Sequence, residues 1–264
     1  MNRNMLKAAR GRGFTLVELM VAMAIALLLT VVIGEVFLNT RRSSTIQDDQ
    51  ARMQENTRFA VQTISRIVRQ SSFRSYVGVA ASTYFPYATA PAITGTEGGT
   101  TVSDQITVRF QGSGTASAAD STILDCLGTS YAFGATGMST FAIRSGGSDG
   151  NGLFCTADDP TSGSAVWQEL VPGVENMQIL YGQDTDADRT ANVYQRISDI
   201  SSTSSNLDNI VSARFALLLR SPTDTSQVKN TNSYTLNGVS VGPFNDGRVR
   251  RVVNFTVNLR NRTP

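Results

Sequence analysis

The stretch RGRGFTLVELMVAMAIALLLTVVIGEVFL, residues 10–38, decides the fold, because a basic segment gives way at Gly13 to a long apolar run. As a helix, residues 14–38 would be about 37 Å long, enough to cross a hydrocarbon core of about 30 Å. Between Leu19 and Gly34 no residue is charged, and Thr30 carries the only polar side chain. The sequence therefore predicts a transmembrane helix over residues 14–38.

The segment ahead of this run, residues 1–13, has four basic residues and no acidic one. By the positive-inside rule this charge keeps the N-terminus in the cytoplasm and sends the bulk of the chain outward. A secretory signal peptide has its small-residue cleavage site after the apolar core. Here Gly13 precedes the core, so a cut after Gly13 would remove only a basic leader and leave the transmembrane helix on the mature protein.

Glu18 is unusual because it lies in the first turns of the predicted transmembrane helix. A carboxylate costs up to about 2.5–3.5 kcal/mol at the bilayer centre and less near the interface, and such residues usually serve a function with a partner. Glu18 is therefore a candidate functional residue.

The segment GFTLVE, residues 13–18, resembles the class III signal of type IV prepilins and of type II secretion pseudopilins. The resemblance implies that a prepilin peptidase cuts between Gly13 and Phe14 and that the Phe14 amine is N-methylated. It also implies an assembly role for Glu18, opposite the N-terminal ammonium of a neighbouring subunit. Such a pair is physically reasonable, because opposite charges attract strongly at low dielectric constant and each is costly when buried alone. The alternative is an ordinary signal anchor that carries one acidic residue by chance. It would not explain why the basic leader, the Gly13–Phe14 pair and Glu18 occur together.

The composition allows one membrane helix and one globular head, since 41% of the 264 residues are hydrophobic. The leader holds four of the 23 basic residues and none of the 21 acidic ones, so its removal turns a net charge of +2 into −2. No basic tract or aromatic-rich basic patch occurs, and direct nucleic-acid binding is not expected. The chain has no histidine, which removes Ser-His-Asp and Cys-His catalysis, and no carboxylate pair stands out. We expect no enzymatic activity.

Helical character continues beyond the span as an amphipathic half, residues 39–76. Apolar residues recur on one stripe that would form the spine of the head: Ile46, Met53, Ala60, Ile64, Ile67 and Val68. Many pilins carry a proline, which kinks the helix, at the position that Glu35 occupies here. No proline or glycine lies between Glu35 and Phe73, so we expect one helix without a kink. Glu35 is expected to pair with Arg41 or Arg42.

Alternating apolar and polar residues predict strands in the remaining chain, residues 77–264. The predicted strands lie at residues 106–110, 141–143, 174–181, 211–219 and 249–259. Each would bury one face and expose the other, as in an antiparallel sheet covered by a helix. An irregular connection is expected at residues 79–101 and surface loops at 112–122, 145–165 and 198–209. The predicted class is α+β, the type IV pilin fold, with a long N-terminal helix packed on an antiparallel β-sheet head.

Cys126 and Cys155 lie in the part predicted to be outside the cytoplasm, where disulfides form and persist. A bridge closing a loop of about 30 residues contributes about 3–4 kcal/mol in the chain-entropy model. A zinc site is the weaker alternative, since two thiolates without a histidine make a poor set of ligands.

The motif DTDADR suggests a calcium loop, because Asp184, Asp186 and Asp188 have the spacing of the first three ligands of an EF-hand. Arg189 stands where that loop needs glycine, and Gln195 where it needs glutamate. An acidic turn between two strands is the alternative, and no other cofactor is expected.

Three further segments resemble PilW-type minor pilins, which are related to the J-type pseudopilins: LDCLG at 124–128, LVPGVENMQILYGQDTDADR at 170–189 and IVSARFALLLRS at 210–221. The resemblance implies a minor pilin that primes type IV pilus assembly in the inner membrane, its head in the periplasm, and then sits at or near the pilus tip. Implied partners are other minor pilins, the major pilin, the prepilin peptidase and the inner-membrane assembly platform. Implied processes are cell adhesion and twitching motility.

Two alternatives stay open. A J-like pseudopilin of type II secretion shares the N-terminal signal, although the 251 residues left by a leader of 13 are long for that type. A tip adhesin would use its loops to bind a surface. Because the K-type subunit at the extreme tip lacks the acid that Glu18 supplies, the resemblance places this chain just beneath such a subunit.

Overall fold

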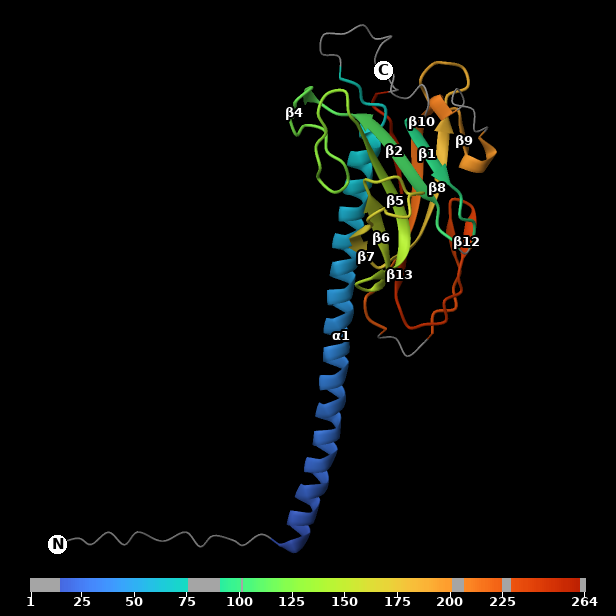
Figure 1. The fold of residues 1–264 in the computed structure, drawn as a ribbon. Helices are drawn as coiled ribbons and strands as arrows, with labels where there is room; N and C mark the ends of the chain where they lie inside the picture. Colours follow the sequence, from blue (N-terminus) through green and yellow to red (C-terminus); the bar gives the residue numbers. More distant parts are fainter. Residues whose placement is uncertain (1–14, 76–90, 101, 201–206, 225–228, 262–264) are drawn as a thin grey trace, which may run out of the picture. The chain divides into compact units, whose positions relative to one another are not determined.

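The computed structural model describes residues 15–75, 91–100, 102–200, 207–224 and 229–261. The chain divides into two compact units, Met1–Asp48 and Asp49–Pro264. One helix, α1 (Leu16–Gln70), supplies the described part of the first unit and continues into the second (Figure 1). Phe14, where the membrane span was expected to begin, lies outside the described residues.

The described part of the first unit, residues 15–48, is a helix without a core. Its apolar side chains are exposed, and the stretch meets the length and hydropathy expected of a membrane span, with none of the 18 residues of its most apolar window buried. The Thr30 hydroxyl donates to the Ala26 carbonyl at 2.7 Å, so this polar group is satisfied within the helix. The lateral surface of the unit is left almost entirely apolar between Leu19 and Gly34.

The second part of α1 buries the predicted apolar stripe. Five of its members are buried in the head: Met53, Ala60, Ile64, Ile67 and Val68. Ile46 was predicted on the same stripe but remains 37% exposed, because it belongs to the first unit and precedes the packed part of the helix. The helix ends at Gln70, and Asn261 donates from its side-chain amide to the Ser71 carbonyl at 2.9 Å.

The head contains two larger antiparallel sheets instead of the single sheet that the sequence suggested. The first has the order β1-β2-β5-β6-β7, from β1 (Ile93–Thr96), β2 (Gln105–Gln111), β5 (Thr136–Gly147), β6 (Gly150–Thr156) and β7 (Gln168–Pro172). The second has the order β13-β10-β8-β9, from β8 (Val174–Gln183), β9 (Val193–Gln195), β10 (Ile210–Arg220) and β13 (Arg250–Asn258). Smaller elements are β3 (Gly114–Thr115), β4 (Ala118–Ala119), η3 (Ile197–Asp199), β11 (Tyr234–Leu236) and β12 (Val239–Val241).

One core joins both sheets to the helix. In the β8–β10 pair Ile179 lies opposite Phe215, and Phe215 stacks on Phe255 of β13 with ring centroids 5.0 Å apart. Ile64 and Ile67 of α1 are fully buried in the same cluster. The alternation of apolar residues therefore identified the faces that meet the helix.

The prediction of a solvated outer face was wrong for β10, where Ala216 and Leu218 are fully buried. They pack in a second small core under the β11–β12 hairpin, which contributes Leu236. This hairpin turns at Asn237 and Gly238, both with positive φ, and the Asn237 amide donates to the Gln178 carbonyl at 2.9 Å. Asn-Gly between alternating apolar residues is a strong hairpin signal, and the sequence analysis missed it.

Three of the expected irregular segments contain strands. β1 forms within 79–101, whose residues 79–90 lie outside the described part, and β6 lies in the glycine-rich segment 145–165. A Cβ on Gly152 would lie 2.5 Å from the Glu169 carboxylate of neighbouring β7, so glycine here gives room to a side chain from the adjacent strand. Smaller strands, β3 and β4, occur in 112–122.

Candidate functional site

The start of α1 is held by a reciprocal pair of residues, Thr15 and Glu18. The Glu18 carboxylate accepts hydrogen bonds from the Thr15 backbone amide at 3.1 Å and from its hydroxyl at 3.2 Å. The Glu18 amide donates to the Thr15 hydroxyl at 3.3 Å. This is a capping box, in which the two side chains satisfy amides that the first helical turn leaves without partners. Gly13 and Phe14 lie outside the described residues.

The capping box fixes where the predicted assembly residue points. Glu18 lies near the positive end of the helix dipole, which favours a carboxylate there. Its side chain is exposed in the single chain, and a carboxylate can accept about four hydrogen bonds. Glu18 can therefore cap its own helix and accept a further donor from another molecule.

Glu35 does not pair as proposed. Among residues 15–75 it forms no ion pair with Arg41 or Arg42. The Arg41 guanidinium instead lies over the Phe37 ring, 4.5 Å from its centroid. Positions 37 and 41 are one turn apart on the helix, so the ring is the nearer partner.

The predicted disulfide joins Cys126 and Cys155, with Cα atoms 6.4 Å apart. Both cysteines are buried, and their bond ties the loop after Leu124 to strand β6. Asp125 organises this loop, because its carboxylate accepts from the Leu127 amide at 2.8 Å and from the Tyr131 hydroxyl at 2.9 Å. The zinc alternative is wrong, since each sulfur is bonded to the other.

The three aspartates of the DTDADR motif come together at the turn after β8, where one oxygen of each lies within 4.8 Å of the others. Asp184 accepts from the Ala187 amide at 2.7 Å and from the Arg189 amide at 2.8 Å. Asp188 accepts from the Thr190 amide at 2.8 Å, and the hydroxyl and amide of Thr190 lower the pKa of Asp188. The loop is thus closed by its own hydrogen bonds.

The two departures from the calcium pattern have different structural outcomes. Arg189 adopts φ 67°, so the turn forms in the left-handed conformation for which glycine is preferred. Gln195 is paired with Tyr181 in the β8–β9 ladder, which places the twelfth position in the sheet. The loop can present three carboxylates to a cation, but it lacks the closing carboxylate of an EF-hand.

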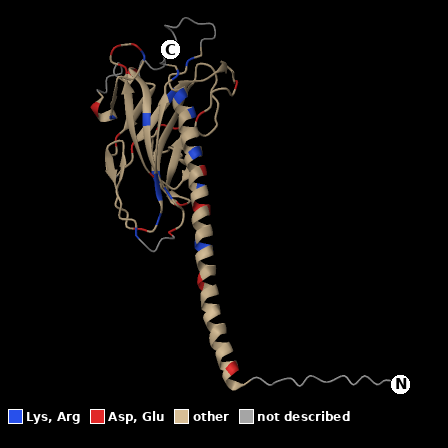
Figure 2. Cartoon of the chain, turned by 180° about the vertical axis from the view of Figure 1, so that it is seen from behind, with Lys and Arg blue, Asp and Glu red and all other residues tan. Residues whose placement is uncertain are grey.

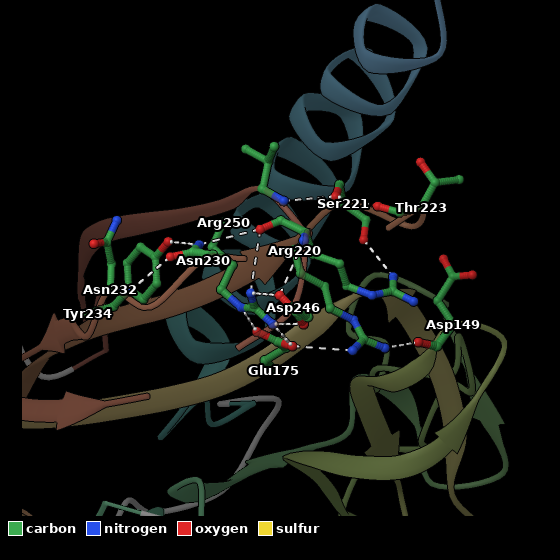
Figure 3. A network of polar contacts seen from close by, with 12 residues as sticks. Asp149, Glu175, Arg220, Ser221, Thr223, Asn230, Asn232, Tyr234, Asp246 and Arg250 are labelled. Atoms are coloured by element: carbon green, nitrogen blue, oxygen red, sulfur yellow. Dashed lines mark hydrogen bonds and ion pairs between the residues drawn. The ribbon is translucent and has the colours of Figure 1, made fainter. Parts of the chain in front are cut away.

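A buried ionic cluster at one end of the second sheet was missed by the sequence analysis (Figure 3). The fully buried Arg250 guanidinium donates to Glu175 at 2.6 Å and 3.0 Å and to Asp246 at 2.6 Å through each of two nitrogens. Arg220 donates to Glu175 at 3.3 Å. The cluster therefore clamps β8, β10 and β13 to the segment that carries Asp246.

Hydrogen bonds continue from this cluster toward α1. Ser221 accepts from the Val249 amide at 3.1 Å, and its hydroxyl donates to the Thr223 carbonyl at 3.0 Å. The Thr223 hydroxyl donates to the buried carboxylate of Asp49 on the helix. Partners in this network are 75 residues apart for Glu175 and Arg250 and 174 for Asp49 and Thr223, so no local motif could have revealed them.

Comparisons with known proteins give three findings. Residues 140–261 match the family model described as Type IV Pilus-assembly protein W, and residues 9–34 match the prokaryotic N-terminal methylation motif. Together these ranges cover more than half of the chain. No curated protein matches the sequence. A solved type IV-like pilin from Thermus thermophilus aligns at 13% identity with a TM-score of 0.48, covering 81% of this chain and 100% of the pilin.

Proposed function

Since the chain is a type IV minor pilin of the PilW type, we propose that it primes pilus assembly in the inner membrane and enters the pilus at or near its tip. One observation carries this proposal. The head completes its own core, whereas the apolar surface of α1 before Asp49 has no partner among the described residues. A helix of this kind is stable in lipid or in a bundle of similar helices.

Residues at the start of α1 determine which subunits can join such a bundle. Cleavage after Gly13 would leave Phe14 as a new N-terminus directly ahead of the capping box. The Glu18 carboxylate keeps hydrogen-bonding capacity on an exposed face, where the N-terminal ammonium of a neighbouring subunit could pair with it. The Glu18 carboxylate thus selects subunits that have been processed.

The head acts as a structural part of this assembly, and the family matches point to a structural subunit rather than an enzyme. The methylation motif and the apolar helix suit membrane anchoring. The buried disulfide is consistent with a head that folds in the periplasm, where such bonds persist. Other minor pilins, the major pilin, the prepilin peptidase and the assembly platform are its proposed partners.

The decisive experiment compares pili and attachment in a deletion strain and in strains complemented with the wild type or with Glu18→Ala. We expect the deletion and Glu18→Ala to lose most surface pili, because priming needs the paired helix. Normal pili with lost attachment would indicate a tip adhesin. Normal pili with a defect in protein secretion would indicate a J-like pseudopilin, and either result would overturn the priming proposal.

Intact mass spectrometry of the chain from pili and from inner membranes tests processing separately. A chain that starts at methylated Phe14 in the pilus fraction, and gains two hydrogens on reduction, is expected. A processed chain confined to membranes would contradict incorporation at the tip. An uncut chain starting at Met1 would contradict the assembly mechanism itself.

A further inference from the structure

A groove of about 600 Å³ lies in the head beside the C-terminal end of α1. Its walls come from three separate segments. They are the last turns of the helix, the loop that carries Ile123, and the end of the chain segment after β13, where Arg260 and Asn261 lie. None of these residues belongs to the disulfide, the acidic loop or the buried ionic cluster.

Three arginines surround this groove: Arg66, Arg69 and Arg260. All three are exposed, and none forms an ion pair with an acidic side chain within the described ranges. Figure 2 shows that basic positions recur along the C-terminal part of α1. The groove is therefore a site of concentrated positive charge on a chain whose processed form is net negative.

The charge is not needed to cap the helix. Cations near a helix C-terminus can stabilise its last carbonyl groups. Here the Asn261 side-chain amide lies within 3.4 Å of the carbonyl oxygens of both Arg69 and Gln70. The guanidinium groups are thus left for a partner from outside the chain.

The floor of the groove is apolar. Val61, Phe73 and Ile123 line it and are only partly buried. An amphipathic peptide can place an apolar side chain on this floor and carboxylates against the rim, whereas the phosphates of a duplex have no apolar group with which to cover the floor. The side-chain amide oxygen of Gln70, Oε1, is buried and has no hydrogen-bond partner among the described atoms, so a rotation of this side chain would offer an acceptor to a peptide N–H group.

We propose that this groove docks an acidic amphipathic segment of a neighbouring pilin subunit, with carboxylates paired to Arg66, Arg69 and Arg260. The inference rests on the proposed function, because it takes another subunit of the assembly as the partner. Guanidinium groups bind carboxylates through two parallel hydrogen bonds, so three of them around an apolar floor define both charge and orientation. The contact would order subunits through their heads, in addition to the pairing at Glu18.

Photocrosslinking in cells tests the proposal on the full chain. A benzophenone amino acid replaces Gln62, which is exposed and lines the groove, and adducts are recovered from both inner membranes and pili. We expect an adduct with another pilin subunit, mapped by mass spectrometry to a segment rich in Asp and Glu. An adduct with nucleic acid or phospholipid, or no adduct in either fraction, would overturn the proposal.

Charge reversal shows whether the arginines carry the contact. The variant Arg66→Glu/Arg69→Glu should lower the adduct yield about tenfold, as expected for a loss of about 1.4 kcal/mol in affinity. Arg52→Glu/Arg58→Glu makes the same change of charge on exposed positions of the same helix outside the groove, and should leave the yield within about twofold. Equal yields in the two variants would contradict the assignment.

A compensating change separates binding from folding. Lysines introduced at the mapped acidic positions of the partner should restore the adduct with Arg66→Glu/Arg69→Glu, which a misfolded head could not do. Failure to restore it, with the disulfide still formed, would overturn the proposal. Pili that form normally in the Arg66→Glu/Arg69→Glu strain, but not in the Glu18→Ala strain, would overturn this inference while leaving the priming function intact.

Discussion

Thr15 contributes to the start of α1 through its hydroxyl, which accepts from the Glu18 amide and donates to the Glu18 carboxylate. Loss of such a cap typically costs about 1 kcal/mol. Thr15→Val should therefore increase hydrogen exchange at the Glu18 amide about fivefold in detergent micelles, whereas Thr15→Ser should not. Thr30→Val is the control, because that hydroxyl donates to a carbonyl already used by the helix. Unchanged exchange in Thr15→Val would show that the capping box is dispensable.

Asp246 makes the stability of the head depend on pH. Its hydrogen bonds to Arg250 lower its pKa from 3.8 to about 2. The ionised carboxylate is therefore more favourable in the folded state than in the unfolded state. The stabilisation is complete above about pH 4 and is lost as the pH falls through about 2. We expect the unfolding temperature of the wild type, followed by the fluorescence of Trp167, to fall across this range.

Asp246→Asn should flatten that part of the pH profile and lower the unfolding temperature at neutral pH. Asp199→Asn is the control, because Asp199 is exposed and has no ion pair within the described residues. A profile of Asp246→Asn that still parallels the wild type would assign the acid sensitivity to other carboxylates.

The sequence identified residues whose signal is local and missed those whose partners are distant. Glu18 was recognised because an acid among apolar residues is conspicuous, and its partner Thr15 is three positions away. Glu175 and Arg250 gave no signal, because each is an ordinary charged residue until folding brings them together across 75 positions. Burial of an ion pair depends on the whole fold and cannot be read from spacing.

At the scale of elements, the β11–β12 hairpin covers a face of β10 that would otherwise be exposed. Leu236 is fully buried in that contact, so Leu236→Ala should lower the free energy of unfolding by about 2–5 kcal/mol. Urea unfolding followed by Trp167 fluorescence measures the change. The matched Val249→Ala substitution, at a position 40% exposed, should cost much less. Similar losses for the two variants would mean that the hairpin does not seal a second core.

The acidic loop after β8 is closed by its own hydrogen bonds, so we expect calcium to have little effect on it. Unfolding temperatures in millimolar calcium and in excess chelator should agree within about 1 °C, because a ligand stabilises only in proportion to its binding to the folded state. A rise with calcium that Asp186→Asn abolishes would contradict this and establish a calcium site formed by Asp184, Asp186 and Asp188.

Element prediction succeeded where the period of apolar residues was clear and failed where glycine obscured it. The strands around Phe215 and Ile179 were found from alternation. β6 was predicted to be part of a surface loop because residues 145–165 are rich in Gly, Ser and Asp, although Gly152 makes room for Glu169 in the sheet. The division of the head into two sheets could not be predicted, since strand order depends on long-range pairing.

At the scale of the molecule, the two units differ in what protects them from proteolysis. Residues 15–48 of the first unit bury no apolar side chain, whereas the helix after Asp49 is packed into the head. Local opening should therefore cost less around Arg41 and Arg42 than around Arg66 and Arg69. In micelles, trypsin should cut first at Arg41 or Arg42 and release a head fragment that keeps the disulfide, as mass spectrometry will show. First cleavage at Arg66 or Arg69 would contradict the division into units.

The hydrogen bond from Asn261 to Ser71 joins residues 190 positions apart, so it can form only after almost the whole chain has been synthesised. The stripe of α1 that contains Ile64 is covered by strands that follow much later in the sequence, up to Val257 of β13. Contacts of such high sequence separation form slowly, so the apolar stripe stays uncovered while the head is synthesised. Chaperones and quality-control proteases therefore have their longest opportunity to act on this protein before its last strand has joined the sheet.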